Sequence, residues 1–438
     1  DYLTLDRPTP TLSGGEFQRA RLASSLGSGL IGICYVLDEP TIGLHSRDTN
    51  RMIEILKDLR DRGNSILVVE HDVDVMRASE WLVDLGPGAG KEGGSVLWSG
   101  SPSGLIGDSP TAAAMSMASD LPLALSDEAS GKENAIVDFE QRLRLEGASR
   151  HNLKDVSVEI PLGLLTVVTG VSGCGKSSLI THTLIPAARH ALNESNRSRR
   201  VPAGDEASFP PTDLSQLDIA CRSICGTEHI DRLVVVDQSP IGRSGRSNPA
   251  THTGIWDEVR KVFAKTRDAR VRGFKARRFS FNAKDGRCPK CEGRGTQHIE
   301  MNFLPDVHVE CPDCRGARFN VQTLGVKYRG SGVGDVLRMR IDEARDFFKD
   351  FPKLKSTLEV MCDVGLGYLE LGQSALTLSG GEAQRIKLAA ELGKGGEEKV
   401  LYVLDEPTTG LHSVDVARLV ALFRRLLEKG NSVLVVEH

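Results

Sequence analysis

Long apolar segments are missing from this chain. None of its apolar runs approaches the roughly 18 residues that a membrane-spanning helix requires. Residues 1–30 also lack the basic segment followed by an apolar one that directs secretion. These absences argue against a membrane or secreted protein, so we expect a cytoplasmic protein with no membrane contact.

A surplus of positive charge is missing too. The net charge is −4 and the isoelectric point is near 6.3, which argues against non-specific nucleic-acid binding by the chain as a whole. Any contact with DNA must then come from a local basic patch. With 39% hydrophobic and 26% charged residues, the composition is that of a soluble globular protein, and 438 residues are enough for two or three domains.

The chain repeats itself. Three motifs recur in the same order at offsets of 366, 367 and 367 residues: LSGGEFQR at 12–19 and LSGGEAQR at 378–385, LDEPTIGLH at 37–45 and LDEPTTGLH at 404–412, and GNSILVVEH at 63–71 and GNSVLVVEH at 430–438. Such a constant offset indicates two copies of one large unit rather than chance similarity.

The two copies differ in extent. A GxxxxGKS loop occurs once, at 170–177, and its counterpart in the first copy would lie before residue 1. The first copy continues through LVDLGPGAG, whereas the second stops at His438. We therefore expect a chain that is cut at both ends. We predict a first half over 1–100, a polar mobile linker over 101–135 and a second half over 136–438, with a surface insertion at 191–215.

The GxxxxGKS loop lies between a short apolar, β-branched run at 164–169 and a segment with helical apolar spacing. A strand, a glycine-rich loop and a helix in this order favour a phosphate-binding loop over an incidental glycine-rich turn. The lysine is expected to reach the β- and γ-phosphates and the serine hydroxyl to bind Mg²⁺. The predicted nucleotide-binding residues here are Gly170, Gly173, Gly175, Lys176, Ser177 and Ser178.

Two apolar runs end in an Asp-Glu pair, at Asp38-Glu39 and Asp405-Glu406. A buried strand carries such a pair to the sheet edge where nucleotides bind in open α/β folds. The aspartate is predicted to hold Mg²⁺ through water and the glutamate to polarise the attacking water as general base. Taken alone, the pair would more often cap a helix, but its repetition beside LSGGE favours catalysis.

LSGGE places a serine and two glycines directly before an amphipathic helix and so forms a second anion site. LSGGExQR is the signature of ABC ATPases, and resemblance to that superfamily implies that the signature of one half closes over the phosphate loop of the other. The residues matched to this signature are Ser13, Gly14, Gly15, Ser379, Gly380 and Gly381.

The same resemblance assigns two further roles. His71 and His438 match the switch histidine that senses the γ-phosphate, and Gln238 matches the Q-loop residue that contacts Mg²⁺ and the attacking water. One complete ATP site is then expected, comprising Lys176, Ser177, Gln238, Asp405, Glu406 and His438 with Ser13, Gly14 and Gly15. The other site has Asp38, Glu39, His71 and the second signature but no phosphate loop in this chain.

Nine cysteines are present, and four of them form the pattern C-x2-C, nineteen residues, C-x2-C. These four are Cys288, Cys291, Cys311 and Cys314, and each pair is followed closely by glycine. Four thiolates make a closed tetrahedral Zn²⁺ site, which is structural because no ligand position stays open. A redox dithiol pair is the rival interpretation. Alternating apolar and polar residues between the pairs predict a two-stranded hairpin.

A basic segment leads into this pattern. Residues 264–295 contain eleven Lys or Arg against three acidic residues, a local excess of +8, with phenylalanines at 274, 279 and 281. Basic charge interleaved with aromatic residues suits contact with a DNA backbone, although a solvated charged face is the alternative. The predicted DNA-binding residues are Arg272, Lys275, Arg277 and Arg278, within an inserted zinc module at about 264–325.

Several long strings resemble the UvrA family of bacterial DNA-damage-recognition ATPases: RFSFN, MNFLPDV, VDQSPIGRSGRSNPATHTG and DVGLGYLELGQSALTLSGGEAQR. The resemblance covers nearly the whole chain apart from 101–135 and 191–215. It implies an α/β fold of the ABC type with two nucleotide-binding halves, the first incomplete, helical signature subdomains and an inserted zinc-ribbon hairpin. It also implies ATP-dependent binding of damaged double-stranded DNA, a homodimer, no nuclease activity of its own and, in the intact protein, delivery of UvrB.

Three other classes share part of this pattern. A transporter ATPase has the nucleotide motifs but no zinc hairpin inside its ATP domain, and an ATPase of the SMC type would insert a long coiled coil, for which no heptads occur here. A UvrA-like paralogue used in drug self-resistance would share almost every motif, and this alternative stays open.

Overall fold

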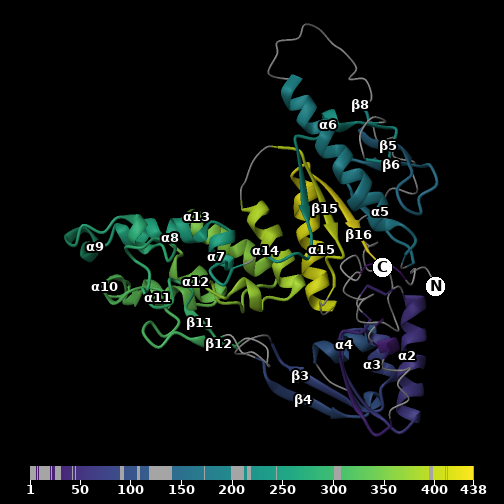
Figure 1. The fold of residues 1–438 in the computed structure, drawn as a ribbon, viewed down its shortest axis with the longest axis horizontal. Coiled ribbons are helices and arrows are strands. Elements are labelled where there is room, and N and C mark those ends of the chain that lie inside the picture. The colour runs from purple at the N-terminus through teal and green to yellow at the C-terminus, as the bar shows by residue number, and fades with distance from the viewer. Residues whose placement is uncertain are drawn as a thin grey trace. The chain divides into compact units, whose positions relative to one another are not determined.

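The computed structural model describes residues 6, 8, 20, 22–24, 31–41, 43–44, 46–88, 93–105, 109–117, 141–171, 173–198, 212–214, 219–242, 244–299, 307–393, 398–409, 411 and 413–437. The chain divides into two compact units (Figure 1). The first unit comprises Asp1–Asp237 and Glu397–His438, and the second comprises Gln238–Gly396. No described helix is long and apolar enough to cross a membrane.

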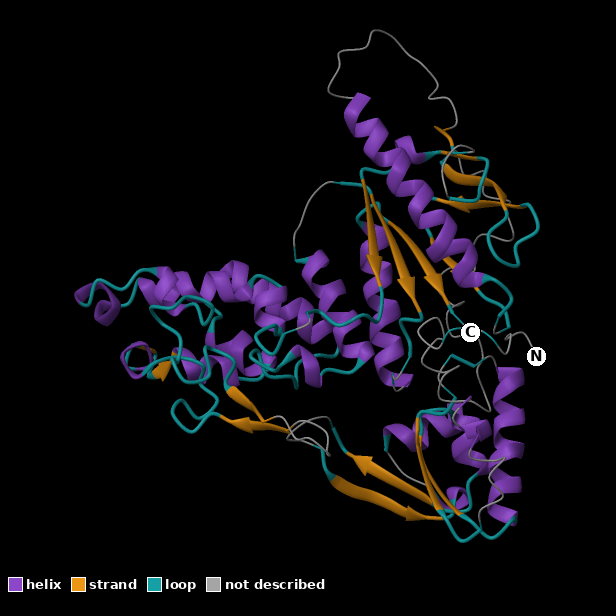
Figure 2. Ribbon diagram, in the orientation of Figure 1, coloured by secondary structure: helices purple, strands orange, loops and turns teal. Residues whose placement is uncertain are grey.

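A parallel sheet forms the centre of the second nucleotide-binding half (Figure 2). Its four strands are, in spatial order, β10 (Arg232–Val236), β15 (Val400–Asp405), β16 (Ser432–Val436) and β7 (Leu165–Val168). β15 and β16 are buried at almost every position. They are therefore continuous apolar runs, as strands covered on both faces must be.

A long helical segment packs on this sheet. It begins with α5 (Lys176–Leu179), passes through the π-helical turn η4 (Ile180–Leu184) and continues as α6 (Ile185–Ser198). Ile180 and Leu184 share one buried cluster with Leu401 and Leu434 of the sheet. The same cluster takes in an antiparallel sheet of order β6-β5-β9-β8, made of β5 (Arg142–Ala148), β6 (Val156–Pro161), β8 (Thr212–Asp213) and β9 (Ser223–Cys225). Helix α15 (Ser413–Glu428) connects β15 to β16.

The first half repeats part of this architecture. Parallel strands β1 (Cys34–Asp38) and β2 (Ser65–Val69) flank α2 (Ser46–Asp61), and they are followed by α3 (Val73–Ala78), the antiparallel pair β3 (Leu82–Gly86) and β4 (Ser95–Gly100), η3 (Pro102–Gly104) and α4 (Pro110–Met117). The side chain of Asn64 accepts from Ile33 N at 3.1 Å, and that of Asn431 accepts from Val400 N at 3.0 Å. The repeat therefore extends to individual hydrogen bonds.

The two copies differ in how deeply their matching strand residues are buried. Val36 and Leu67 of the first copy are 65% and 58% exposed, whereas their counterparts Val403 and Leu434 are 2% and 0% exposed. In the second half this face of the sheet is covered by the cluster that contains α5 and α6. The strand sequences are nearly the same, so the covering elements account for the difference.

The second unit is mainly helical, with α7 (Pro249–His252), α8 (Ile255–Ala264), α9 (Arg267–Val271), η6 (Ala276–Phe279), α10 (Val321–Leu324), α11 (Val333–Arg338), α12 (Ile341–Phe347), α13 (Pro352–Asp363), η7 (Ala375–Thr377) and α14 (Gly380–Leu392). Short hairpins are formed by β11 (Thr296–Ile299) with β12 (Val307–Glu310) and by β13 (Lys327–Tyr328) with β14 (Ser331–Gly332). Aromatic side chains fill its core, where Trp256 packs against Phe281 and Phe319.

The expected α/β fold of the ABC type, with a helical signature region and an inserted four-cysteine hairpin, is confirmed. The hairpin predicted between the cysteine pairs is present as β11 and β12. Two details differ from the sequence predictions. Helix α4 (Pro110–Met117) lies inside the predicted linker 101–135, and α6 continues to Ser198 through the start of the predicted insertion 191–215. Residues 118–140 and 199–211 lie outside the described residues. The predicted domain boundaries stay predictions.

Candidate functional site: a sheet edge for nucleotide and a four-cysteine ribbon

The phosphate loop and the Asp405-Glu406 pair lie at one edge of the four-stranded parallel sheet. Asp405 is in register with Val436 of β16, and Val436 is in register with Val168 of β7. Two strand spacings, about 10 Å, therefore separate the end of β15 from the end of β7. The phosphate loop begins directly after β7, so the sheet brings the loop and the Asp405-Glu406 pair to the same edge.

The backbone of the loop requires glycine. Gly170, Gly173 and Gly175 have φ values of 151°, 79° and 113°, which residues with a Cβ rarely adopt. A Cβ on Gly170 would lie 2.8 Å from the sulfur of Cys174, and one on Gly175 would meet Asn152 at 3.1 Å. Gly175 also precedes the first residue of α5, so the N–H groups at the start of this helix open toward the loop.

The Lys176 side chain is buried to 8% exposure, and its ammonium donates to the Gly170 carbonyl at 2.6 Å. Ser177 is exposed, and Ser178 shares a hydrogen bond of 3.2 Å with Nδ1 of His151. A lysine folded into its own loop and a serine hydroxyl at the surface are the groups that a nucleotide with Mg²⁺ would engage. Hydroxyl and carboxylate oxygens are ligands that suit Mg²⁺.

A second segment supports the loop, and no sequence motif indicated it. The Asn152 amide donates to the Gly173 carbonyl at 3.2 Å, and the preceding residue, His151, has a φ of 54°. Burial is the main cause that lowers the pKa of the neighbouring His182, whose ring lies 5.6 Å from that of His151. The turn before β6 therefore contacts the loop directly through Asn152.

The two predicted general bases share an unusual backbone conformation. Glu39 and Glu406 have φ values of 45° and 47°, in the left-handed region that non-glycine residues rarely occupy. Their amides donate to Val69 O and Val436 O, both at 2.9 Å. Such conformations persist only where the surroundings fix them, and they concentrate at functional sites. The shared geometry supports a shared role for these two glutamates.

Beside each of these glutamates lies a second carboxylate that the sequence analysis did not single out. Glu70 accepts hydrogen bonds from N and Oγ1 of Thr41 at 2.8 and 2.6 Å. Glu437 accepts the same two bonds from Thr408 at 3.0 and 2.7 Å. The only sequence signal was that VVEH and DEPT both recur, and nothing in the sequence indicated that they touch.

The structure brings His71 and Glu39 together, with 3.5 Å between Nε2 and Oε1. A hydrogen bond to Glu39 raises the pKa of His71, and burial opposes this effect. His438 lies outside the described residues, as do Ser13, Gly14 and Gly15. The roles of these four residues therefore stay predictions.

The second signature segment forms a helix start with a complete capping box. The Ser379 hydroxyl accepts from Glu382 N at 3.2 Å, and the Glu382 carboxylate accepts from Ser379 N at 2.8 Å. Tyr368 donates its hydroxyl to the same carboxylate at 2.5 Å. Gln238 belongs to this unit, and a Cβ on Gly380 would lie 3.5 Å from its side chain. Gly381 is the second residue of α14.

The four predicted zinc ligands form one buried cluster. Their sulfurs all lie within 4.8 Å of one another, with 4.0 Å from Cys288 to Cys311 and 3.6 Å from Cys291 to Cys314. A tetrahedral site with Zn–S bonds near 2.3 Å has an S–S edge of about 3.8 Å. A disulfide would require about 2.05 Å. The cluster therefore fits Zn²⁺, and burial raises the pKa of the Cys288 and Cys314 thiols.

The two turns that each contain one cysteine pair, here called knuckles, have the same backbone pattern. Left-handed residues occur at Glu292, Gly293 and Gly295 after the first pair and at Arg315, Gly316 and Arg318 after the second. Each knuckle also binds the other, because Cys288 N donates to Arg318 O and Cys311 N donates to Gly295 O, both at 2.9 Å. These two hydrogen bonds hold the cysteine pairs beside each other without any contribution from a metal ion.

Arg318 extends from the second knuckle into the core. Its side chain is 6% exposed, and its guanidinium donates to the carbonyls of Gly372 at 2.8 Å and Arg246 at 3.4 Å. It also lies over the Phe281 ring at 5.3 Å. None of the described carboxylates forms an ion pair with it, and burial lowers its pKa while Cys291 and Cys314 oppose that effect. Thiolates at the cluster would give this buried charge a counter-charge.

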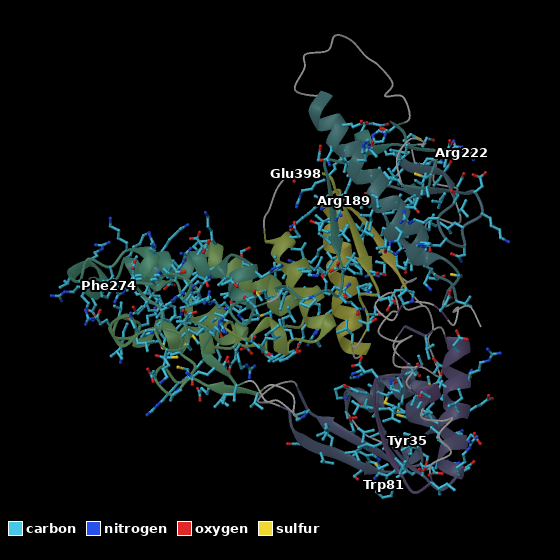
Figure 3. All side chains as sticks on the ribbon, viewed as in Figure 1. Tyr35, Trp81, Arg189, Arg222, Phe274 and Glu398 are labelled. Carbon is cyan, nitrogen blue, oxygen red and sulfur yellow. The ribbon has the colours of Figure 1, made fainter. Side chains whose placement is uncertain are left out.

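The basic segment contains both exposed and structural residues. Lys275 and Arg277 are exposed. Arg278 is half-buried, donates to Oγ1 of Thr323 at 3.0 Å and lies over the Phe274 ring at 4.6 Å. Arg272, although exposed, donates to the Gln322 carbonyl at 3.4 Å. Figure 3 shows Phe274 in the part of the second unit that α9 occupies in Figure 1.

The aromatic part of the predicted DNA surface requires a correction. Phe279 and Phe281 are 0% and 1% exposed, so they cannot stack on nucleic-acid bases. They pack in the aromatic core, where the Trp256 indole donates to the Phe279 carbonyl at 3.2 Å. Only Phe274 of the three is partly exposed.

A parallel sheet with a phosphate loop after β7 and an Asp-Glu pair after β15, together with a capped signature helix and an inserted four-cysteine ribbon, is the architecture of ABC-type P-loop ATPases. No protein-family model matches the chain. Over its whole length it is 49% identical to UvrABC system protein A of Oceanobacillus iheyensis and 50% identical to that of Micrococcus luteus, of which it covers 43% and 42%.

The crystal structure of UvrA2 from Deinococcus radiodurans superimposes on the whole chain with a TM-score of 0.85 at 46% identity, and the match covers 50% of that protein. The chain is therefore similar to UvrA proteins over its whole length. It spans less than half the length of the curated relatives that it matches.

Proposed function

We propose that this chain forms the part of a UvrA-type DNA-repair ATPase that converts ATP and water to ADP and phosphate and couples this reaction to the binding of damaged double-stranded DNA. The observation that carries the ATPase proposal is the meeting of the phosphate loop and the Asp405-Glu406 pair at one sheet edge. Ligands bind at this edge in open α/β sheets.

The residues divide the chemistry as follows. Lys176 binds the β- and γ-phosphates of the substrate, while Ser177 and Asp405 hold Mg²⁺, whose charge stabilises the developing negative charge on the transferred phosphoryl group. Glu406 accepts the proton of the attacking water as general base. The left-handed backbone of Glu406 supports this role, because it sets the position and direction from which the carboxylate side chain extends. His438 and the Ser13–Gly15 segment complete the proposed site, and the role of Gln238 stays a prediction.

The proposed cofactors are Mg²⁺ for hydrolysis and one structural Zn²⁺ in the cysteine cluster. The proposed DNA surface consists of exposed cations near the ribbon, led by Lys275 and Arg277. Homodimer formation, delivery of UvrB, a cytoplasmic location and the absence of nuclease activity are proposed for the intact protein on the basis of its similarity to UvrA proteins. UvrB delivery is not assigned to residues of this chain.

One preparation of the purified chain tests the proposal. ATP binding, ATP turnover and DNA binding are measured with undamaged duplex and with the same duplex carrying one bulky lesion. We expect Mg²⁺-dependent ATP binding, turnover that changes when DNA is added, and tighter binding of the lesion duplex. ATP binding that persists at wild-type strength in Lys176→Ala would contradict the assignment of the nucleotide site.

A further inference from the structure

We propose that Glu437 is a positioning residue for ATP hydrolysis, and that Glu70 does the same for the first half. Each carboxylate ties the end of the strand before the switch histidine to the turn after the catalytic Asp-Glu pair. The kinetic part of this proposal rests on the proposed ATPase function, whereas its structural part does not.

The geometry is specific to the turn. Glu437 follows the last residue of β16, and its Oε1 accepts from both N and Oγ1 of Thr408, two residues after Glu406. Backbone bonds frame the same turn, since Glu406 N donates to Val436 O at 2.9 Å and Thr409 N donates to Glu406 O at 3.2 Å. The Glu437 carboxylate therefore adds two side-chain hydrogen bonds to the backbone bonds that hold the turn containing Glu406.

The first half repeats both hydrogen bonds to threonine. Glu70 accepts from the same two atoms of Thr41, and its second oxygen accepts from the amides of His71 at 3.0 Å and Asp72 at 3.3 Å. Both glutamates are half-buried, and holding a long side chain in one geometry costs conformational entropy. That both copies direct this side chain to the corresponding threonine, Thr41 or Thr408, indicates a role at the turn.

The physical consequence concerns the left-handed glutamates. Glu39 and Glu406 hold backbone conformations that persist only where neighbouring contacts fix them. Removing the acceptor at residue 437 frees both donors of Thr408, so the turn after β15 gains alternative conformations. The Glu406 carboxylate is then held less often where it can accept the proton of the attacking water. Phosphate binding through Lys176 does not depend on this turn, so substrate affinity should change little.

The test compares Glu437→Ala with Glu437→Gln, whose amide oxygen can still accept both bonds, and with Thr408→Val, which removes only the hydroxyl. The exposed surface glutamate of α13 provides the control variant Glu359→Ala. Turnover and KM for ATP are measured alongside hydrogen exchange of the peptide 404–411, with the peptide 37–44 as an internal reference. We expect Glu437→Ala to lower kcat about 10- to 100-fold, the range for a misplaced catalytic group. KM should stay within about 2-fold, because ground-state binding is retained.

Exchange in 404–411 should rise in Glu437→Ala and stay unchanged in 37–44, and Glu437→Gln should restore most of the turnover and most of the protection. Glu70→Ala should give the reciprocal exchange pattern. If Glu437→Ala lowers kcat while 404–411 keeps its protection, or if protection disappears across the whole first unit, the positioning role is overturned. If the wild-type chain shows no turnover, the proposed ATPase function fails for this chain. The two exchange patterns alone then still support or overturn the proposal that Glu437 and Glu70 fix the turns after the Asp-Glu pairs.

Discussion

Nε2 of His71 lies 3.5 Å from Oε1 of Glu39, so the residues that follow two neighbouring strands of the first half form one pair. The pKa of His71 is raised above its ordinary value of 6.5, chiefly by the hydrogen bond to Glu39. A raised folded-state pKa stabilises the fold fully below the unfolded value and loses that contribution as pH rises through the folded value. The pairing of His71 with Glu39 therefore stabilises the fold of the first half at mildly acidic pH, where His71 is protonated.

NMR titration of the His71 imidazole should give a pKa above 6.5 in the wild-type chain. Glu39→Gln should move this pKa downward, because it removes the negative charge that favours the imidazolium. His229, which lies beside Glu228, provides a control resonance in the same spectrum. A His71 pKa that is unaffected by Glu39→Gln would show that the pair does not form in solution.

Two substitutions separate nucleotide binding from chemistry. Lys176→Ala should abolish ATP binding and turnover, because the lysine supplies the charge that holds the phosphates. Glu406→Gln should keep ATP binding and lose turnover by about 100-fold or more, as expected when a general base is removed. Fluorescent-nucleotide titration and phosphate release measure the two effects. Equal weakening of binding in both variants would place Glu406 in substrate binding instead.

Metal analysis should find one tightly held Zn²⁺ per chain. Replacing Cys311 and Cys314 together by serine should remove it, because a closed structural site cannot hold the metal tightly with only two thiolates. We expect faster hydrogen exchange in β11 and β12 and unchanged exchange in β15 and β16, since a structural metal stabilises mainly its own module. Zinc retained by the double variant would contradict the assignment.

Arg318 should support zinc binding from outside the ligand set. Arg318→Gln removes a buried positive charge that interacts electrostatically with Cys291 and Cys314. Zinc affinity, measured by competition with a chelator, should fall about 10-fold, the lower end of the range for partners of metal ligands. Arg318→Lys should retain part of the effect. The neighbouring Arg315, which is exposed, provides the control Arg315→Gln, and an equal decrease in that variant would exclude a specific role for Arg318.

The basic segment can be divided experimentally. Replacing Lys275 and Arg277 by glutamine should weaken binding to every duplex and lower the slope of log K against log salt by about 0.9 for each phosphate that is no longer neutralised. The preference for damaged DNA should change less, because phosphate contacts position the protein without specifying the site. Arg278→Gln should instead destabilise the segment, since Arg278 holds Thr323. An unchanged salt slope in the double variant would place the DNA surface elsewhere.

The sequence by itself determined the elements whose chemistry is local. The glycines of the phosphate loop, the LSGGE segment at the start of a helix and the spacing of the four cysteines each require a particular residue at a particular place within a short segment. Such patterns can be recognised before any fold is known. The repeated motifs likewise predicted two copies of one unit, because a repeat is a property of the sequence.

Tertiary structure alone decided which side chains are available. Phe279 and Phe281 stand among basic residues in the sequence, yet they are buried, because Phe263 packs against Phe279 while Trp256 and Phe319 pack against Phe281. The bond between Glu437 and Thr408 spans 29 residues and joins two motifs that looked independent. Contacts of this kind form only when the fold brings separate segments together.

The clearest case is a pair of strands with nearly one sequence. β1 reads CYVLD and β15 reads VLYVLD, and both end at an Asp-Glu pair. Val36 is 65% exposed, whereas its counterpart Val403 is 2% exposed. The residues determine that each segment forms a strand, but burial depends on the area that other elements remove from water. The helices beside β15 supply that cover, and no pattern within the strand itself could have shown it.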